Sequence, residues 1–472
     1  MHRIRTCKLI QRDAHKETRI TPMTTTYQEL HRPQFHFTAK TNWINDPNGL
    51  VYLDGVWHLY FQHNPESTVW GNMTWGHAVS DDLIHWRQLE HAMFPDEHGT
   101  MFSGSAVVDH EDTAGFGAGA IVFLYTAAGR HVDPPRQFTQ CLAWSADNGM
   151  TLTKYEGNPV LGWIEGDNRD PKISWHAASR QWIMPLFLAD DRFTLYGSKD
   201  LKSWTHRQDL RLEGDRECPD FFPLVDESGE ERWVFWGANG LYRIGRFDGT
   251  TFTPETPVLT CENGRNGYAA QTWSNVPDGR CIQISWMAGG LFPEMPFNHQ
   301  MSIPVTLELA GSGEAARLRR WPVREVESLR ERKVRIEQVT IAPGSPVAPK
   351  TDAKLMDVSF TVRRGDGRAL NVNIRGQALT FAWDEKEMRF AGGQAPGMVK
   401  GRAFAPLPEG ESLDVRLLID RTSVEVFLNG GDVSASYCFL PGAYERPLVL
   451  QSWQGNSTLE RLELFELSSI WQ

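Results

Sequence analysis

A recurring turn pattern in the first two thirds of this chain constrains its fold more than any other sequence feature. Residues 80–86 read SDDLIHW, residues 198–204 read SKDLKSW, and looser copies occur at residues 145–151 and 247–252. An aspartate in such a turn can accept hydrogen bonds from backbone amides. The four aspartates, spaced by roughly 50 to 65 residues, are Asp82, Asp147, Asp200 and Asp248. A repeat of about 40–50 residues with insertions is typical of a four-stranded propeller blade.

The segment that carries these turns has the composition of an all-β domain. Short aromatic and β-branched runs, such as residues 56–61, 120–125, 182–187 and 232–236, alternate with turn residues. Four copies of the turn and one strand-rich stretch without a copy predict a five-bladed β-propeller over residues 31–311. A β-sandwich or a single barrel is the alternative for such strands.

A second domain is predicted after the repeats. Residues 312–333 are rich in arginine and glutamate and are expected to form a linker. Alternating strand patterns return at residues 357–362, 415–420 and 423–428, and the last is followed by Asn429-Gly430, a strong hairpin turn. Residues 334–472 are therefore expected to form a C-terminal β-sandwich with a structural or accessory role. Residues 1–30 lack a folding pattern and predict a disordered N-terminal extension.

The net charge and the hydropathy of the chain limit which binding partners and which compartment can be expected. The 472 residues carry a formal net charge of −11, which argues against nucleic acid and anionic membranes as partners. A neutral sugar substrate is compatible with this charge, and nothing predicts the oligomeric state. Residues 1–20 lack the apolar segment of a secretory signal, so we expect a cytoplasmic protein, or a secreted one if the start is mis-called.

Three acidic residues lie in motifs that form tight turns. They are Asp46 in NDPNG, Asp170 in RDP and Glu217 in RECPD. Cleavage of a glycosidic bond needs carboxyl groups as nucleophile and proton donor. The innermost strands of propeller blades line a common channel, so residues far apart in sequence can converge there. The motifs predict a glycoside hydrolase, whereas each carboxylate taken alone could simply cap a turn.

The motifs resemble those of glycoside hydrolase family 32, which contains invertases, inulinases and levanases. The matching segments, in family order, are residues 43–49, 102–105, 169–171, 217–219, 268–273 and 301–304. Residues 420–427 resemble the signature of the family's C-terminal sandwich. The resemblance implies a five-bladed propeller with an appended sandwich that hydrolyses β-fructofuranosides with retention. The likeness is greatest to bacterial levanases.

The resemblance also implies roles for the three acids. Asp46 matches the nucleophile, Glu217 the acid/base and Asp170 the transition-state stabiliser. A retaining enzyme needs an ionised nucleophile and a protonated acid. We expect the apolar neighbours of Glu217 to raise its pKa, and Arg169 to keep Asp170 charged.

Further residues match positions that bind the terminal fructose in the family: Asn45, Gln62, Trp70, Phe102 and Ser103. Arg169 and Trp286 are additional candidates for substrate binding. Their amide, hydroxyl and aromatic groups suit a sugar pocket, although turn polarity or core packing would also explain them. The histidines show no ligand-like spacing, so no metal or cofactor is expected.

The predicted function is a fructan β-fructosidase that acts on levan or inulin and on sucrose through a covalent fructosyl-enzyme. Fructosyl transfer on the same fold is an alternative, because acceptor sites leave no pattern in the sequence. A fructan-binding protein without catalysis is another alternative, against which the three intact acids argue. A sialidase is a further alternative, but no cluster of three arginines is evident.

Overall fold

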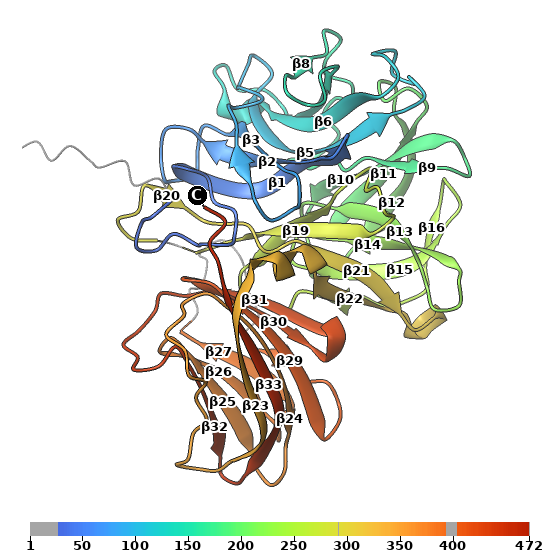
Figure 1. The fold of residues 1–472 in the computed structure, drawn as a ribbon. Coiled ribbons are helices and arrows are strands. Elements are labelled where there is room, and N and C mark those ends of the chain that lie inside the picture. Colours follow the sequence, from blue (N-terminus) through green and yellow to red (C-terminus); the bar gives the residue numbers. More distant parts are fainter. Residues whose placement is uncertain (1–26, 291, 393–403, 472) are drawn as a thin grey trace, which may run out of the picture.

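The structure, a computed structural model, describes residues 27–290, 292–392 and 404–471. Nearly all regular structure in these residues is β-strand, and the strands form seven sheets. Five sheets come from residues 42–322 and two from residues 330–467, and they form the blue-to-yellow and the orange-to-red bodies of Figure 1. The prediction of an all-β fold is confirmed.

The five N-terminal sheets follow one another along the chain. The first contains β1 (Asn42–Leu53), β2 (Val56–Asn64), β3 (Thr74–Ser80), β4 (Arg87–Gln88) and β20 (Phe297–Asn298). The second contains β5 (Thr100–Asp109), β6 (Ala120–Ala128), β7 (Thr139–Ser145) and β8 (Thr153–Lys154). The third contains β9 (Ser174–His176), β10 (Gln181–Ala189), β11 (Arg192–Ser198) and β12 (Thr205–Arg211). The fourth contains β13 (Asp220–Val225), β14 (Glu231–Trp236), β15 (Leu241–Phe247), β16 (Phe252–Pro254) and β17 (Leu259–Thr260). The fifth contains β18 (Gly267–Thr272), β19 (Cys281–Met287), β21 (Val305–Ala310) and β22 (Arg317–Pro322).

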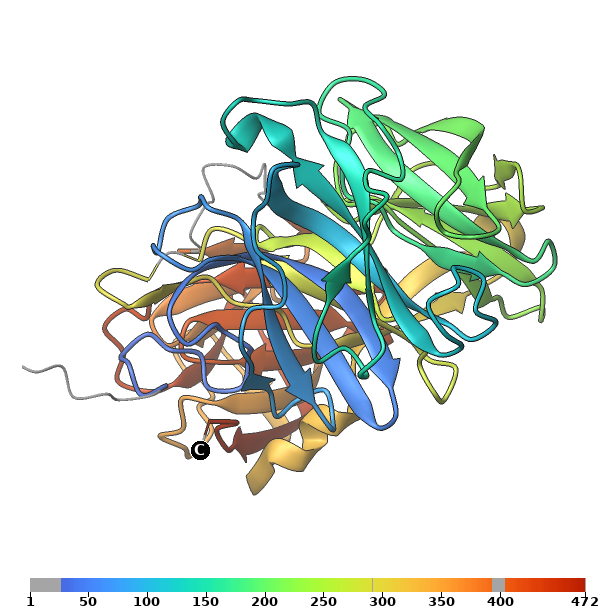
Figure 2. The same cartoon turned by 90° about the horizontal axis from the view of Figure 1, so that it is seen from above.

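The series of sheets closes on itself as a β-propeller. Among the first strands of the sheets, β1 contacts both β5 and β18, and β13 contacts β18. Strand β20 lies between β19 and β21 of the fifth sheet in sequence, but it pairs in parallel with β1 of the first sheet, with Asn42 opposite Phe297. Figure 2 looks onto these sheets from above, with sandwich strands behind them.

The repeated aspartates lie where the sequence pattern places them, in the turns between the third and fourth strands of four sheets. Each carboxylate accepts a hydrogen bond from a backbone N–H of its own turn, at 2.7–2.9 Å. The donors are the amides of His85, Thr151, Ser203 and Thr251. The fifth sheet turns differently, through the 3₁₀ segment η2 (Gly313–Ala315), with Gly311 at a φ of +73°. This explains why the fifth sheet has no copy of the turn.

Residues 312–333 do not form the predicted linker. They contain β22, which completes the fifth sheet, then η3 (Arg324–Leu329) and the start of β23 (Arg330–Ile341). In β22 the more exposed Arg317 and Arg319 alternate with the buried side chains of Leu318 and Arg320, and η3 buries Val326 and Leu329. The alternation in β22 is what a half-buried edge strand requires.

The C-terminal domain consists of two sheets around one core. One sheet contains β23, β33 (Ser457–Leu467), β24 (Met356–Arg363), β29 (Ser412–Ile419), β30 (Ser423–Leu428) and β31 (Val433–Cys438). The other contains β28 (Ala405–Pro406), β27 (Glu387–Ala391), β26 (Gln377–Ala382), β25 (Ala369–Ile374) and β32 (Leu448–Trp453). Their facing apolar side chains form a separate core, as in a β-sandwich. The 3₁₀ segment η4 (Asn429–Gly431) joins β30 to β31.

The two domains share a continuous apolar contact. The largest core cluster of the propeller includes Leu418, Phe427 and Leu467 of the sandwich. Residues 1–26 of the predicted N-terminal extension lie outside the described residues. Its last residues are described, and the Tyr27 ring stacks on Trp471 with centroids 4.0 Å apart. Within the described part of the chain, no helix has the length and hydrophobicity to cross a membrane.

Candidate active site

One cavity of about 450 Å³ in the propeller collects the predicted site residues. All ten of them line it: Asn45, Asp46, Gln62, Trp70, Phe102, Ser103, Arg169, Asp170, Glu217 and Trp286. The cavity therefore brings together residues that lie more than 200 positions apart in the chain. It also includes five residues that the sequence reasoning did not select: His131, Phe138, Asp167, Arg216 and Tyr268.

The site is built from the first strands of the five propeller sheets. Asp46 lies in β1, Ser103 in β5 and Tyr268 in β18, whereas Asp170 and Glu217 lie shortly before β9 and β13. The pairing of β1, β5 and β18 with their neighbours shifts register beside these residues, between Ile44 and Pro47 for β1. Such bulges redirect side chains and are frequent next to active sites.

The backbone is also strained at the acids. Asp170, Glu217 and Cys218 have φ angles of 63°, 57° and 40°, in the left-handed region that residues other than glycine rarely adopt. Strain of this kind persists only where the surrounding structure enforces it, and it clusters at functional sites. Here it turns two carboxyl groups from separate sheets into one cavity.

Asp46 is held by three donors. Its Oδ2 accepts a hydrogen bond from Ser103 Oγ at 2.5 Å and its Oδ1 accepts one from Asn45 Nδ2 at 3.3 Å. The Cys218 thiol also donates to Oδ2, at 3.5 Å. Burial raises the pKa of Asp46 and so does the nearby charge of Glu217, while these donors oppose the rise. The donors fix the orientation of the Asp46 carboxylate in the cavity.

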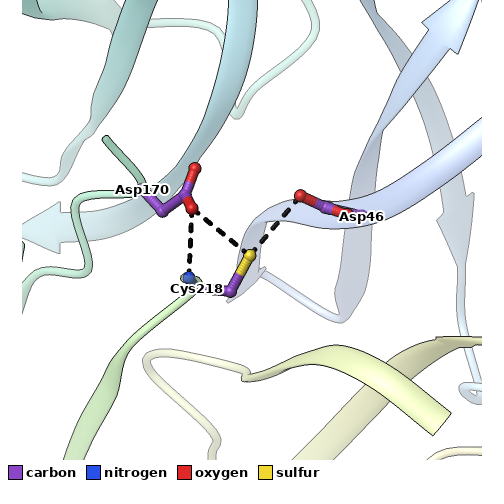
Figure 3. A group of neighbouring side chains, drawn as sticks. All are labelled: Asp46, Asp170 and Cys218. Carbon is purple, nitrogen blue, oxygen red and sulfur yellow. Dashed lines mark hydrogen bonds between the residues drawn. The ribbon is translucent and has the colours of Figure 1, made fainter. Parts of the chain in front are cut away.

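Asp170 and Asp46 meet around Cys218, as Figure 3 shows. Asp170 Oδ2 accepts hydrogen bonds from the Cys218 backbone N–H at 3.0 Å and from its thiol at 3.5 Å. One carboxylate oxygen of each aspartate and the sulfur lie within 4.8 Å of one another. Burial raises the pKa of Asp170 to about 7, with Arg169 opposing and the other two acids adding to the rise.

These three groups are the described side chains closest to a metal-ligand arrangement. A cysteine binds metal as the thiolate. Burial raises the pKa of the Cys218 thiol well above its usual range, and the charges of Asp170 and Asp46 add to this rise. The protonated thiol acts as a hydrogen-bond donor toward Asp46 and Asp170.

Glu217 is surrounded by donors. Its Oε1 lies 2.6 Å from Arg169 Nη2 and 2.6 Å from Arg216 Nη2, and its Oε2 accepts a hydrogen bond from Tyr268 Oη at 2.5 Å. Burial acts to raise the pKa of Glu217, but the charge of Arg169 and the Tyr268 hydrogen bond outweigh it and lower this pKa.

Two predictions are therefore wrong: the pKa of Glu217 is lowered rather than raised, and burial raises the pKa of Asp170 in spite of Arg169. Arg169 follows Asp167 and Asn168 in the chain and is adjacent to Asp170, yet its guanidinium reaches Glu217. Its Nε is 3.7 Å from Asp170, against 2.6 Å between Nη2 and Glu217. Asp170 is therefore the acid nearest to Arg169 in the sequence, whereas Glu217 is nearer to it in space.

An aromatic wall faces these charged groups. Trp70 and Phe102 meet edge to face with centroids 6.0 Å apart, and His131 stacks on Phe102 at 5.3 Å. Phe138 packs behind them. His131 and Phe138 lie in a loop without a sequence motif, so only the structure could identify them. Arg216 and Tyr268, in contrast, lie within segments that the motif comparison already marked.

A sugar-sized cavity with converging carboxyl groups, flanked by hydroxyl, amide and aromatic groups, defines a glycoside hydrolase. The family model of the glycosyl hydrolases family 32 N-terminal domain matches residues 36–322. The model of the family 32 C-terminal domain matches residues 325–466. The chain therefore belongs to glycoside hydrolase family 32.

Relatives of known name and structure agree with this assignment. A levanase of Bacillus subtilis (strain 168) is 36% identical over 490 residues, covering 94% of this chain and 72% of the relative. The exo-inulinase of Aspergillus awamori superposes with a TM-score of 0.83 at 26% identity, over 94% of this chain and 100% of that chain. A fructofuranosidase from Schwanniomyces occidentalis complexed with fructose superposes with a TM-score of 0.83 at 26% identity, over 95% of this chain and 100% of that chain. The predicted family and the β-propeller and β-sandwich folds are confirmed.

Proposed function

We propose that this chain is a retaining fructan β-fructosidase that removes terminal β-D-fructofuranosyl residues from levan or inulin and also cleaves sucrose. The observation that carries the proposal is the single cavity that joins Asp46 and Glu217 to a sugar-binding wall. The likeness to a levanase and to exo-inulinases supports fructans as the substrate class.

In the first step, ionised Asp46 attacks the anomeric carbon of the terminal fructosyl unit and forms an ester, and the bond to the leaving oxygen breaks. Glu217 gives its proton to that oxygen, so the leaving sugar departs neutral. Ser103 and Asn45 hold Asp46 in place for the attack. Because orientation is fixed before the reaction, little entropy is lost at the transition state.

In the second step, Glu217 accepts a proton from a water molecule while that water attacks the anomeric carbon. The ester breaks, fructose leaves with its original configuration, and Asp46 is again ionised. Asp170 lies beside both groups and is proposed to hold sugar hydroxyls as positive charge develops at the anomeric carbon. Its contact with the backbone N–H of Cys218 keeps one oxygen oriented.

The test is chromatography of the products from levan, inulin and sucrose, with Asp46→Asn as the control. We expect fructose as the only early product from both fructans, glucose and fructose from sucrose, and no turnover in the variant. A ladder of oligosaccharides would contradict attack at chain ends. Absence of turnover on all three substrates would reject the proposed function.

A further inference from the structure

Arg216 occupies a position that the mechanism above does not use. It lines the outer part of the cavity, and its side chain is 58% exposed, against 19% for Glu217 and 15% for Arg169. Asp167, also at the rim, is 43% exposed. The cavity thus has a deep part with Asp46 and Asp170 and an outer part with Asp167, Arg216 and His131.

The donors around Glu217 conflict with its role as an acid. Its Oε1 faces two guanidinium groups, which can only donate, so a proton on that oxygen displaces one of them, whereas the Tyr268 hydroxyl beside Oε2 can donate or accept. Two of these donors are fixed in place. Arg169 also donates to the Asp167 carbonyl at 2.8 Å and lies over the Phe187 ring, and Tyr268 is buried. Within the described residues, the Arg216 guanidinium has Glu217 as its one ion-pair partner.

Arg216 is therefore the donor that can leave Glu217. The oxygen that Glu217 protonates belongs to the leaving sugar, so this sugar must extend from Glu217 toward the outer part of the cavity. A guanidinium and a carboxylate there offer both donors and acceptors to neighbouring hydroxyls, and the imidazole of His131 offers a flat face.

On the basis of the proposed function, we propose that Arg216, Asp167 and His131 form the binding site of the leaving sugar, and that Arg216 moves from Glu217 to the hydroxyls of that sugar. Once Arg216 has moved, Glu217 Oε1 has one donor fewer and less positive charge beside it. Glu217 then takes a proton from solvent and is ready to give it to the leaving oxygen. Occupancy of the site by a polyhydroxyl leaving group thereby prepares the acid.

The proposal is tested by comparing two substrates in Arg216→Met. Sucrose has a hexose as leaving group, whereas methyl β-D-fructofuranoside releases methanol, which cannot fill the site. We expect kcat/KM for sucrose to fall by roughly tenfold or more, the loss of a hydrogen bond to a charged group. For methyl β-D-fructofuranoside we expect kcat/KM, compared at a pH below the alkaline limb, to change by less than about threefold, because no sugar contact is lost.

Arg211→Met is the matched control. It removes an arginine five positions away, at the end of β12, whose side chain is 62% exposed, pairs with Asp191 and does not line the cavity. We expect both substrates to behave as in the wild type. Asp167→Asn is a second test within the site, with a selective loss for sucrose as the expected result.

A pH profile separates the proposal from a purely structural role. Removing Arg216 takes away a cation beside the carboxyl groups, so the alkaline limb of kcat/KM should move to higher pH with both substrates. An equal fall of kcat/KM for both substrates, or an unchanged ratio between them, would overturn the proposal. Absence of wild-type turnover on sucrose, levan and inulin would instead reject the proposed function, and with it the premise of a leaving-sugar site.

Discussion

Two groups of carboxylates that are largely removed from solvent, one in the propeller cavity and one at the boundary between the domains, differ in their surroundings. In the cavity, Asp46, Asp170 and Glu217 face one another, and two of them sit on strained backbone. At the boundary, Glu262, Asp420 and Glu425 lie apart from the cavity and each accepts bonds from the partner domain.

The boundary carboxylates are saturated with donors. Asp420 accepts hydrogen bonds from the backbone amides of Gln34 and Phe35 at 2.8–3.0 Å and lies 2.8 Å from His36 Nδ1. Glu262 of the propeller pairs with Arg320 at 2.5 Å and accepts the Ser436 N–H of the sandwich at 2.9 Å. Burial acts to raise the pKa of Asp420, but His36 and the amides lower it overall.

The comparison shows two uses of the same chemical group. A buried carboxylate with a full set of donors stays charged and ties segments together. Buried carboxylates that face one another share protons and have displaced pKa values, which suits acid–base chemistry. The sandwich signature at residues 420–427 therefore holds the domains together, whereas the propeller motifs supply the carboxyl groups that are proposed to carry the reaction.

The largest expected effect concerns the cavity. Glu217→Gln should lower turnover of sucrose by about 10² to 10⁴-fold, because no acid remains to protonate the leaving oxygen. Its melting temperature should stay near that of the wild type, since the glutamine fills the same space. Near-normal hydrolysis by a verified, folded variant would show that Glu217 is not the acid.

The second effect concerns the boundary. Asp420→Asn should lower the free energy of unfolding by about 3 kcal/mol, because it leaves a buried, charged His36 without its main partner. Turnover per folded molecule should not change. Asp432→Asn is the control, because this partly exposed residue also joins the domains through Arg319 and should cost under about 1 kcal/mol. A similar loss in both variants would remove the distinction between the two kinds of boundary carboxylate.

The third effect is a pH dependence of stability. Burial opposes the charge on His36, but Asp420 and Glu425 raise its pKa to about 9. Its contribution is fully present below the unfolded value of about 6.5 and is lost as pH rises through 9. Urea unfolding should therefore show a falling free energy between these pH values, with a smaller fall in Asp420→Asn. Equal slopes in the two proteins would contradict the role of this pair.

The smallest effect concerns the pH profile of catalysis. With the pKa of Asp170 at about 7, the carboxyl groups of the cavity lose their last proton near neutral pH, so kcat/KM should fall above that value. Tyr268→Phe removes a donor that favours ionised Glu217, so the alkaline limb of the kcat/KM profile should move to higher pH by up to about one unit. Tyr60→Phe, which removes a buried hydrogen bond to the Gly149 carbonyl, should leave the limb in place. A limb that does not respond to Tyr268→Phe would show that this hydroxyl does not act on the acid.

The sequence predicts the fold best where a local interaction recurs. The four aspartate turns follow from hydrogen bonds within a few residues, so their pattern is visible without a structure. Residues 312–333 were wrongly predicted to form a linker because their many arginines and glutamates resemble a solvent-exposed segment. Whether such arginines cover an edge strand depends on the neighbouring strand, β21, which the local pattern does not reveal.

The sequence predicts most of the residues that line the site, but it does not predict how their pKa values are shifted. Motifs identified Asp46, Asp170 and Glu217, and the propeller explains why they meet. The pKa values of Asp170 and Glu217 depend on which of the two acids Arg169 contacts. Its contact with Glu217 joins two different sheets, so the sequence alone does not reveal it. His131 and Phe138 belong to a loop whose path is set by packing rather than by a motif.

The central claim is that Asp46 acts as nucleophile opposite Glu217. The most direct measurement is mass spectrometry of Glu217→Gln after reaction with β-D-fructofuranosyl fluoride, whose leaving group needs no proton. Without a base to activate water, the fructosyl ester should accumulate, and peptide mapping should place it on Asp46. An adduct on another residue, or the absence of any adduct during fluoride release, would contradict the assignment.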